Sequence, residues 1–280
     1  MTATPQSATA APATDAAEPL VISELHDGGI LRITLNRGAK RNPLSMAMID
    51  AIIADLELAA EEPEVRAIII AAEAPGFCGG HDLKEMTAHR ADEDGGRAFY
   101  EALFARCSQM MQMIVHHPRV IIAEVNGVAT AAGCQLVAAC DMAIAGTNAS
   151  FGVNGINSGL FCSTPMVALS RNIGRKRAME LLTTGTMLNA HEAMTLGLLN
   201  RIVFDRDLTQ ETMKLAAKVA ARSQAVLALG KHAFYQQIEK PLDEAYALTS
   251  KAIVDNMMMK DAKEGIGAFL EKRQPKWSDE

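Results

Sequence analysis

Short apolar segments alternate with longer amphipathic segments between Leu20 and Phe204. The short segments are rich in β-branched residues and predict strands, whereas the longer ones have the spacing of helices. Strands that alternate with helices typically form a sheet covered by helices. The chain therefore predicts an α/β fold. The expected strands are 29–35, 66–72, 120–125 and 141–145, and the expected helices are 45–60, 97–116 and 133–139.

Beyond Phe204 the strand pattern stops, and the rest of the chain predicts only helices, at 208–222, 224–237, 241–258 and 260–273. Asp207 and Pro241 stand where helix starts favour such residues. We therefore expect a core over 19–205 and a C-terminal helical region over 206–280. Residues 1–18 are rich in Ala, Thr and Pro and predict a disordered tail.

Composition excludes several classes of protein. The chain has 280 residues, of which 49% are hydrophobic, so it can bury a large core. Its formal net charge of −6 does not favour nucleic acid, and no basic tract is present. No segment approaches the roughly twenty apolar residues that span a bilayer, so we expect no membrane insertion. An anionic ligand would require local basic residues.

The cysteines and the N-terminal residues together predict the cellular compartment of the protein. The five cysteines are odd in number and scattered, without paired spacing or histidines at zinc-site spacing, so we expect reduced thiols and no metal. Residues 1–18 contain no arginine and no apolar core segment, and they include Asp15 and Glu18. These features disfavour a targeting peptide. A cytoplasmic protein is the resulting prediction.

Two segments each combine an apolar run, a small-residue turn and a helix start. The first is Gly-Phe-Cys-Gly-Gly-His-Asp-Leu-Lys-Glu-Met at 76–86, and the second is Val-Asn-Gly-Val-Ala-Thr-Ala-Ala-Gly-Cys-Gln-Leu-Val-Ala-Ala-Cys-Asp at 125–141. A helix start presents unpaired backbone N–H groups. Two such starts brought together would stabilise a developing oxyanion.

These two segments resemble the motifs of the crotonase superfamily, also called the enoyl-CoA hydratase/isomerase superfamily. The resemblance extends over nearly the whole chain after the N-terminal tail, through Leu-Asn-Arg-Gly-Ala-Lys-Arg-Asn-Pro-Leu at 35–44, Leu-Leu-Thr-Thr-Gly at 181–185, Ala-His-Glu-Ala-Met-Thr-Leu-Gly-Leu-Leu-Asn at 190–200 and Glu-Gly-Ile-Gly-Ala-Phe-Leu-Glu-Lys-Arg at 264–273. Several ordered motifs are far more specific than any one of them.

The resemblance implies a spiral of ββα turns with a C-terminal helical trimerisation region, and a homotrimer or a dimer of trimers. It implies that the backbone N–H groups of His81 and Ala132 bind the thioester carbonyl of an acyl-CoA. Coenzyme A thioester would be the substrate or ligand, with no permanently bound cofactor.

The same motifs depart from the family at two catalytic positions. A hydratase has glutamates where this chain has Gln135 and Gly155. Hydration of an enoyl thioester needs acid-base groups, each of which contributes about 10²–10⁴-fold. Efficient hydration by the usual route is therefore not expected, and Gln135 is best interpreted as a pocket-lining amide. The chain resembles a subgroup of the family whose members also lack both glutamates.

Other side chains near these motifs have two interpretations each. His81 could be a titratable group beside the thioester or only a backbone donor, whereas Asp82 predicts a helix cap. Cys162 could be a nucleophile, although ordinary packing is favoured because no histidine is adjacent. The residues expected along the acyl pocket are Asn154, Asn157, Cys162 and Ser163.

The resemblance also implies basic contacts to coenzyme A. Lys84 and Lys272 match positions near the nucleotide, and Lys272 often reaches a neighbouring subunit in the family. Lys40 and Arg41 are additional phosphate candidates. For each of the four, the alternative is a solvated surface charge.

Two functions remain open at this point. One is an acyl-CoA enzyme related to the hydratases and isomerases of fatty-acid and lipid metabolism. The other is a non-catalytic acyl-CoA-binding or assembly protein that has kept the pocket and lost the chemistry.

Overall fold

The computed structural model describes residues 18–280, so nearly all of the expected N-terminal tail lies outside the described residues. A six-stranded sheet forms the centre of the fold, in the order β1-β2-β3-β4-β6-β9. β1 and β2 pair antiparallel, and the other neighbours are parallel. The strands are β1 Val21–His26, β2 Ile30–Leu35, β3 Ala67–Ala72, β4 Val120–Val125, β6 Met142–Gly146 and β9 Arg201–Val203.

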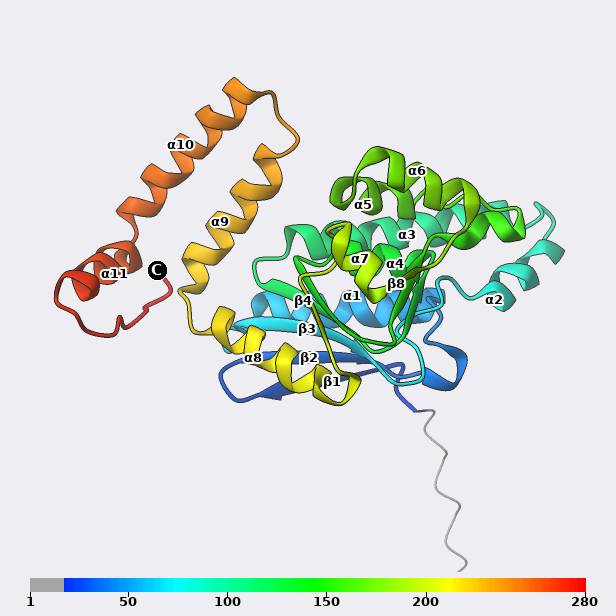
Figure 1. The fold of residues 1–280 in the computed structure, drawn as a ribbon, viewed down its shortest axis with the longest axis horizontal. Coiled ribbons are helices and arrows are strands. Elements are labelled where there is room, and N and C mark those ends of the chain that lie inside the picture. The colour runs from blue at the N-terminus through cyan, green and yellow to red at the C-terminus, as the bar shows by residue number, and fades with distance from the viewer. Residues whose placement is uncertain (1–17) are drawn as a thin grey trace, which may run out of the picture.

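A second, three-stranded sheet lies beside the ends of β3 and β4 (Figure 1). It is made of β5 (Val128–Thr130), β7 (Ser150–Gly152) and β8 (Leu188–Asn189), in that order. β5 follows β4 after two residues, so the chain passes directly from the large sheet into the small one. This change of direction positions the segment that follows β5.

Helices cover both faces of the large sheet (Figure 1). Side chains alternate between the faces of a strand, so Ile68 and Ile70 of β3 join the main core with α1, α3 and α4, whereas Ile69 packs with Leu208 and Leu215 of α8. β3 is buried throughout, as expected for a central parallel strand. The helices up to this point are α1 Met46–Glu61, α2 Leu83–Ala88, α3 Arg97–His116, α4 Ala132–Ala139, α5 Pro165–Asn172, α6 Arg175–Thr184, α7 Ala190–Thr195 and α8 Leu208–Ala220.

The last three helices form an arm that extends away from the sheet (Figure 1). They are α9 (Gln224–Gln237), α10 (Leu242–Met258) and α11 (Lys260–Leu270). No residue of α10 is buried within the described part of the chain. The predicted boundary at 205 falls between β9 and α8, yet α8 packs on the sheet. The division into a core and an oligomerisation region therefore stays a prediction.

A buried ion pair fixes the base of the arm. Lys231 of α9 lies 2.7 Å from the Oδ2 atom of Asp141, and its Nζ also donates to the carbonyls of Ile114 (3.0 Å) and Arg119 (2.9 Å). Tyr235 donates to the Oδ1 atom of Asp141 at 2.9 Å. A buried charge is tolerated when its hydrogen bonds are complete, as they are for this lysine. α9 is thus held to the core through its C-terminal half.

Candidate active site

The first site segment runs from the end of β3 to α2 and is fixed by backbone pairing on two sides. The N–H of Cys78 donates to the carbonyl of Val128 in β5, and the Cys78 carbonyl accepts from Thr130, both at 3.0 Å. The N–H of Leu44 donates to the Gly80 carbonyl at 2.8 Å. Asp82 caps α2 as predicted, because its carboxylate accepts from the N–H groups of Lys84 and Glu85. The segment is therefore rigid where it enters α2.

The second site segment is the turn from β5 into α4, which begins at Ala132. Ala131 has φ 51° and ψ −120°, the backbone conformation of the first central residue of a type II′ turn, where glycine is favoured. Its N–H donates to the Gly152 carbonyl at 2.9 Å. The surrounding pairing thus holds a non-glycine residue in a strained conformation, as often occurs at functional sites.

This strain gives a testable prediction. Ala131→Gly should raise the free energy of unfolding by about 1 kcal/mol, because glycine adopts this φ without steric cost. Denaturant unfolding monitored by circular dichroism measures the change. The matched control is Ala138→Gly, the same change inside α4, which should lower stability by about 0.5–1 kcal/mol. Equal destabilisation by both substitutions would contradict strain at Ala131.

Two glycines allow the segments to meet. A Cβ atom added to Gly80 would lie 3.0 Å from the Cβ of Ala131 and 3.4 Å from the nitrogen of Ala132. A Cβ atom added to Gly133 would lie 2.2 Å from the Cys78 carbonyl oxygen. Any side chain at these positions would force the segments apart. The sequence alone does not distinguish these glycines from the small residues around them, although the adjacent Gly79 and Gly80 indicate a close backbone approach at one of the two positions.

The backbone N–H groups of His81 and Ala132 are both unpaired. Gly80 and Asp82 form the backbone hydrogen bonds to Leu44, so the N–H of the intervening residue points the other way. Ala132 is the first residue of α4, where the N–H has no partner inside the helix. Among residues 18–280 neither N–H donates to a protein acceptor. The site therefore presents two free donors on adjoining rigid segments.

The His81 ring is packed inside the protein. Its Nδ1 lies 3.2 Å from the Leu44 carbonyl oxygen, which can only accept, so Nδ1 carries the proton. The ring meets the edge of Phe104 at 5.2 Å between centroids, and burial lowers the pKa of the imidazole. Nε2 is buried without a hydrogen-bond partner in the described chain. His81 is consequently a neutral imidazole at pH 7.

Gln135 lies in the first turn of α4 and is only 5% exposed. Its Oε1 atom is buried and accepts no hydrogen bond from the described residues. Helical side chains tilt toward the N-terminus, so this amide lies over the turn that contains Ala131 and Ala132. The first turn of α4 therefore contains both a buried acceptor without a hydrogen-bond partner in the described chain and one of the two free donors.

Gly155 belongs to a short 3₁₀ helix, η3 (Asn154–Ser158). A Cβ atom there would lie 2.6 Å from the Leu160 carbonyl oxygen and 2.9 Å from the Sγ atom of Cys162. The space for a side chain at 155 is thus already occupied. Burial raises the pKa of the Cys162 thiol, which is consistent with packing and not with a thiolate nucleophile.

The remaining pocket candidates divide between the site and the surface. Asn154 is at the site, because its Oδ1 accepts from Thr130 Oγ1 at 2.5 Å. Asn157 lies next to Gly185, where a Cβ atom would be 2.6 Å from the Asn157 Oδ1. Ser163 is exposed, and its hydroxyl donates to the Phe161 carbonyl at 3.3 Å.

The four basic candidates do not converge within one chain. Three of them border the first site segment. Lys84 lies on α2, at the end of that segment. The carbonyl of Arg41 accepts from the N–H of Gly79 at 2.8 Å, and Lys40 precedes Arg41 in the chain. Lys272 follows α11, at the opposite side of the molecule from α2 (Figure 1). Only a second subunit could therefore bring a Lys272 side chain to the site.

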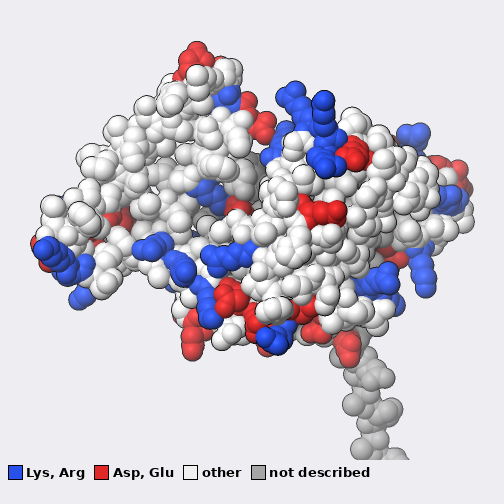
Figure 2. Space-filling view, in the orientation of Figure 1, with Lys and Arg blue, Asp and Glu red and all other residues white. Residues whose placement is uncertain are grey.

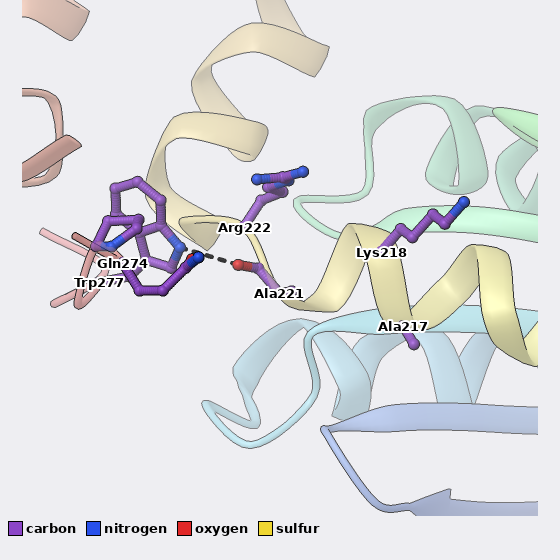
Figure 3. Close-up of a pocket in the computed structure, with 7 residues that line it drawn as sticks. Ala217, Lys218, Ala221, Arg222, Gln274 and Trp277 are labelled. Atoms are coloured by element: carbon purple, nitrogen blue, oxygen red, sulfur yellow. Dashed lines mark hydrogen bonds between the residues drawn. The ribbon is translucent and has the colours of Figure 1, made fainter. Parts of the chain in front are cut away.

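Basic side chains also gather between α8 and the arm (Figure 2). A cavity of about 380 Å³ lies there, and Trp277 closes one side by donating from Nε1 to the Ala221 carbonyl at 2.9 Å (Figure 3). α8 packs on the other face of the sheet from α4, so this cavity lies apart from the two site segments. Its lining residues are Ala217, Lys218, Ala221, Arg222, Gln274, Pro275 and Trp277.

The sequence and the fold of this chain are similar to those of known proteins. The family model described as "Enoyl-CoA hydratase/isomerase" matches residues 26–280, and the chain belongs to this family. The human mitochondrial enoyl-CoA hydratase domain-containing protein 3 is 48% identical over 263 residues, which are 94% of this chain and 85% of that protein. The crystal structure of the human protein has a TM-score of 0.87 at 46% identity, covering 92% of this chain and all of that one.

A bacterial structure is equally similar. The crystal structure of an enoyl-CoA hydratase from Mycobacterium smegmatis has a TM-score of 0.88 at 48% identity and covers 93% of this chain and 99% of that chain. The predicted superfamily, the resemblance to the subgroup represented by enoyl-CoA hydratase domain-containing protein 3 and the crotonase-like α/β fold with a C-terminal helical region are confirmed by these matches.

The prediction of a cytoplasmic location is wrong. The similar human, rat and mouse proteins are all named as mitochondrial. Reduced, buried cysteines indicate only a reducing compartment and cannot distinguish one such compartment from another. In the part of the chain that the structure describes, no helix is long and apolar enough to cross a membrane.

Proposed function

We propose that this chain is an acyl-CoA enzyme of the hydratase/isomerase type in lipid metabolism, in which the N–H groups of His81 and Ala132 bind the thioester oxygen. The observation that carries the proposal is that both N–H groups are unpaired and lie on segments held together at Gly80 and Gly133. Preorganised donors of this kind are among the strongest contributions to acyl-group catalysis. The two N–H groups would polarise the thioester carbonyl through their backbone dipoles.

In this proposal the protein binds the thioester and stabilises negative charge on its oxygen when an enolate forms. The helix start at α4 adds a favourable dipole for that charge. Proton transfer would be the slow step, because neither position has an acid-base group. The amide of Gln135 cannot exchange a proton near neutral pH, and Gly155 has no side chain. Hydration by the parent chain is therefore expected to be slow.

Lys84, Lys40 and Arg41 are proposed to contact the phosphates of coenzyme A from the same subunit, because they border the first site segment. Lys272 is proposed to act from a neighbouring subunit. Asn154, Asn157, Cys162 and Ser163 are proposed along the acyl group, with Asn154 nearest to the thioester because it is bonded to Thr130.

We further propose a homotrimer or a dimer of trimers built on the arm, whose apolar side chains are largely uncovered. Ile253 and Met257 on α10 are 57% and 55% exposed, and Phe269 on α11 is 82% exposed. Exposed apolar area of this extent marks an interface.

Oligomerisation is tested by light scattering coupled to size-exclusion chromatography at micromolar concentration. The parent is expected to be a trimer or hexamer, and the double variant Ile253→Glu/Met257→Glu is expected to dissociate because charges cannot be buried unpaired. Lys251→Glu, a charge change on the same helix, is the control and should remain assembled. A monomeric parent would refute the proposal.

The second candidate function is acyl-CoA binding without catalysis, favoured by the absence of both carboxylates at 135 and 155. A paired assay separates the two functions. Calorimetry measures the binding of crotonyl-CoA and longer enoyl-CoAs, while absorbance follows their consumption by the same preparation. Binding without any consumption supports the second candidate, and consumption that Ala132→Pro abolishes supports the first.

A further inference from the structure

The cavity between α8 and the C-terminal segment has a rigid aromatic wall (Figure 3). Trp277 donates from its indole Nε1 to the Ala221 carbonyl at 2.9 Å. The other end of the indole lies against α11, because a Cβ atom added to Gly265 would be 3.2 Å from two carbon atoms of the six-membered ring. The indole is therefore held at both ends by the protein itself.

The chain that follows Trp277 is also fixed at two points. Asp261 of α11 is 1% exposed, and its carboxylate accepts from the backbone N–H of Asp279 at 2.9 Å. The Asp279 carboxylate in turn lies 2.7 Å from Nη1 of Arg66 and accepts from the N–H of Gln224 at 2.6 Å. These contacts join the C-terminal segment both to α11 and to the core, so the cavity is preformed.

The α8 side of the cavity has two positive charges that the protein does not neutralise. Lys218 lies in the last turn of α8, and Arg222 follows four residues later. Both side chains are exposed and line the cavity, and neither forms an ion pair with a carboxylate of residues 18–280. Like charges at this spacing repel each other, and an anion between them would relieve the repulsion.

The end of α8 does not oppose an anion at this place. The last carbonyl groups of a helix have a partial negative charge. Here Arg66 donates from Nε to the Ala220 carbonyl at 2.7 Å and from Nη2 to the Arg222 carbonyl at 3.0 Å. Trp277 donates to the carbonyl between them. These donors offset the negative helix end, so the positive charges of the cavity remain available to a ligand.

We propose that this cavity binds an organic anion that joins a planar ring to a phosphate, as a nucleoside monophosphate does. The ring stacks on the Trp277 indole, and the phosphate lies between Lys218 and Arg222. Aromatic side chains stack on bases of any kind, and arginine and lysine both bind phosphate oxygens. A volume of about 380 Å³ is within the range of small-molecule sites. The cavity lies apart from the two site segments, so the inference does not depend on the proposed thioester chemistry.

Titration of the parent protein with adenosine 5′-monophosphate, adenosine and inorganic phosphate tests the inference. Trp277 is the single tryptophan of the chain, so tryptophan fluorescence reports on this cavity. The monophosphate should quench this fluorescence, and calorimetry should show that it binds about tenfold or more tightly than adenosine or phosphate, because one molecule makes both contacts.

The charge contribution is tested by Lys218→Gln/Arg222→Gln. This double variant should bind the monophosphate about tenfold or more weakly, because two charge-assisted contacts are lost, and its affinity for adenosine should not change. Lys214→Gln is the matched control, since Lys214 lies one turn earlier on α8 and does not line the cavity. The control should keep the affinity of the parent.

The ring contribution is tested by Trp277→Leu, which should bind the monophosphate no more tightly than phosphate alone in calorimetry. Circular dichroism checks its folding, and if this variant is unfolded, the two substitutions on the exposed side of α8 still decide the result. Trp277→Phe keeps an aromatic ring and should retain part of the difference between the monophosphate and phosphate.

Failure of the monophosphate to bind would overturn the inference, and so would an affinity equal to that of phosphate, because charge alone would then explain the binding. Binding that leaves the Trp277 fluorescence unchanged, or that persists in the double variant, would place the nucleotide elsewhere and would also overturn it. The thioester site is tested separately with crotonyl-CoA, so failure at one site is distinct from failure at the other.

Discussion

Replacing Ala132 with proline is expected to weaken the binding of an enolate-mimicking CoA analogue by about 10²–10³-fold. The substitution deletes the one backbone N–H that α4 offers to a thioester oxygen, and loss of one such donor typically has this effect on the corresponding transition state. Proline is suited to the experiment because Ala132 is the first residue of α4, where proline fits the helix and no internal hydrogen bond is lost. Calorimetry with the analogue measures the change.

The control for this variant addresses Ala131, whose φ of 51° is unfavourable before proline. The double variant Ala131→Gly/Ala132→Pro should be compared with Ala131→Gly alone, since glycine at 131 removes the steric conflict while the Ala132 N–H is still deleted. Equal affinities of these two proteins for the analogue would contradict the assignment of Ala132 as a donor.

Much of the fold was predictable because long elements have a clear periodicity. The helices at Arg97–His116 and Gln224–Gln237 and the strand at Val120–Val125 have the predicted bounds. The strands β5, β7 and β8 were missed because two or three residues cannot show a period, and their pairing depends on partners distant in sequence. β5 is nevertheless the strand that directs Ala132 toward the first site segment.

The sequence motifs were sufficient to predict which backbone positions form the site. Both positions could be located from the small residues around them, and both have an unpaired N–H in the described chain, although His81 lies two residues before α2 and only Ala132 begins a helix. The close contacts of Gly80 and Gly133 could not be predicted, because they arise between segments about fifty residues apart. The packing of Cys162 against Gly155 is likewise a property of the tertiary structure alone.

That packing determines the outcome of restoring the two hydratase carboxylates. Gln135→Glu changes no volume and places a carboxylate in the first turn of α4, so hydration of crotonyl-CoA is expected to rise about tenfold or more, within the range of a single acid-base group. Gly155→Glu should give no gain on its own. Its Cβ would lie 2.6 Å from the Leu160 carbonyl oxygen, and this backbone atom would have to move.

The ordered series of variants separates chemistry from packing. Gly155→Ala should already lower the free energy of unfolding by about 1–3 kcal/mol, as overpacking does, and Gly155→Glu should lower it by about 3 kcal/mol or more. Denaturant unfolding measures stability, and crotonyl-CoA absorbance measures hydration. A stable, more active Gly155→Glu protein would contradict the packing argument.

A parent that hydrates crotonyl-CoA at about 10 s⁻¹, a rate typical of enzymes, would contradict the role given to positions 135 and 155. The acid-base group would then have to be sought elsewhere, and the neutral His81 imidazole, whose buried Nε2 has no hydrogen-bond partner in the described chain, would be the next residue to substitute.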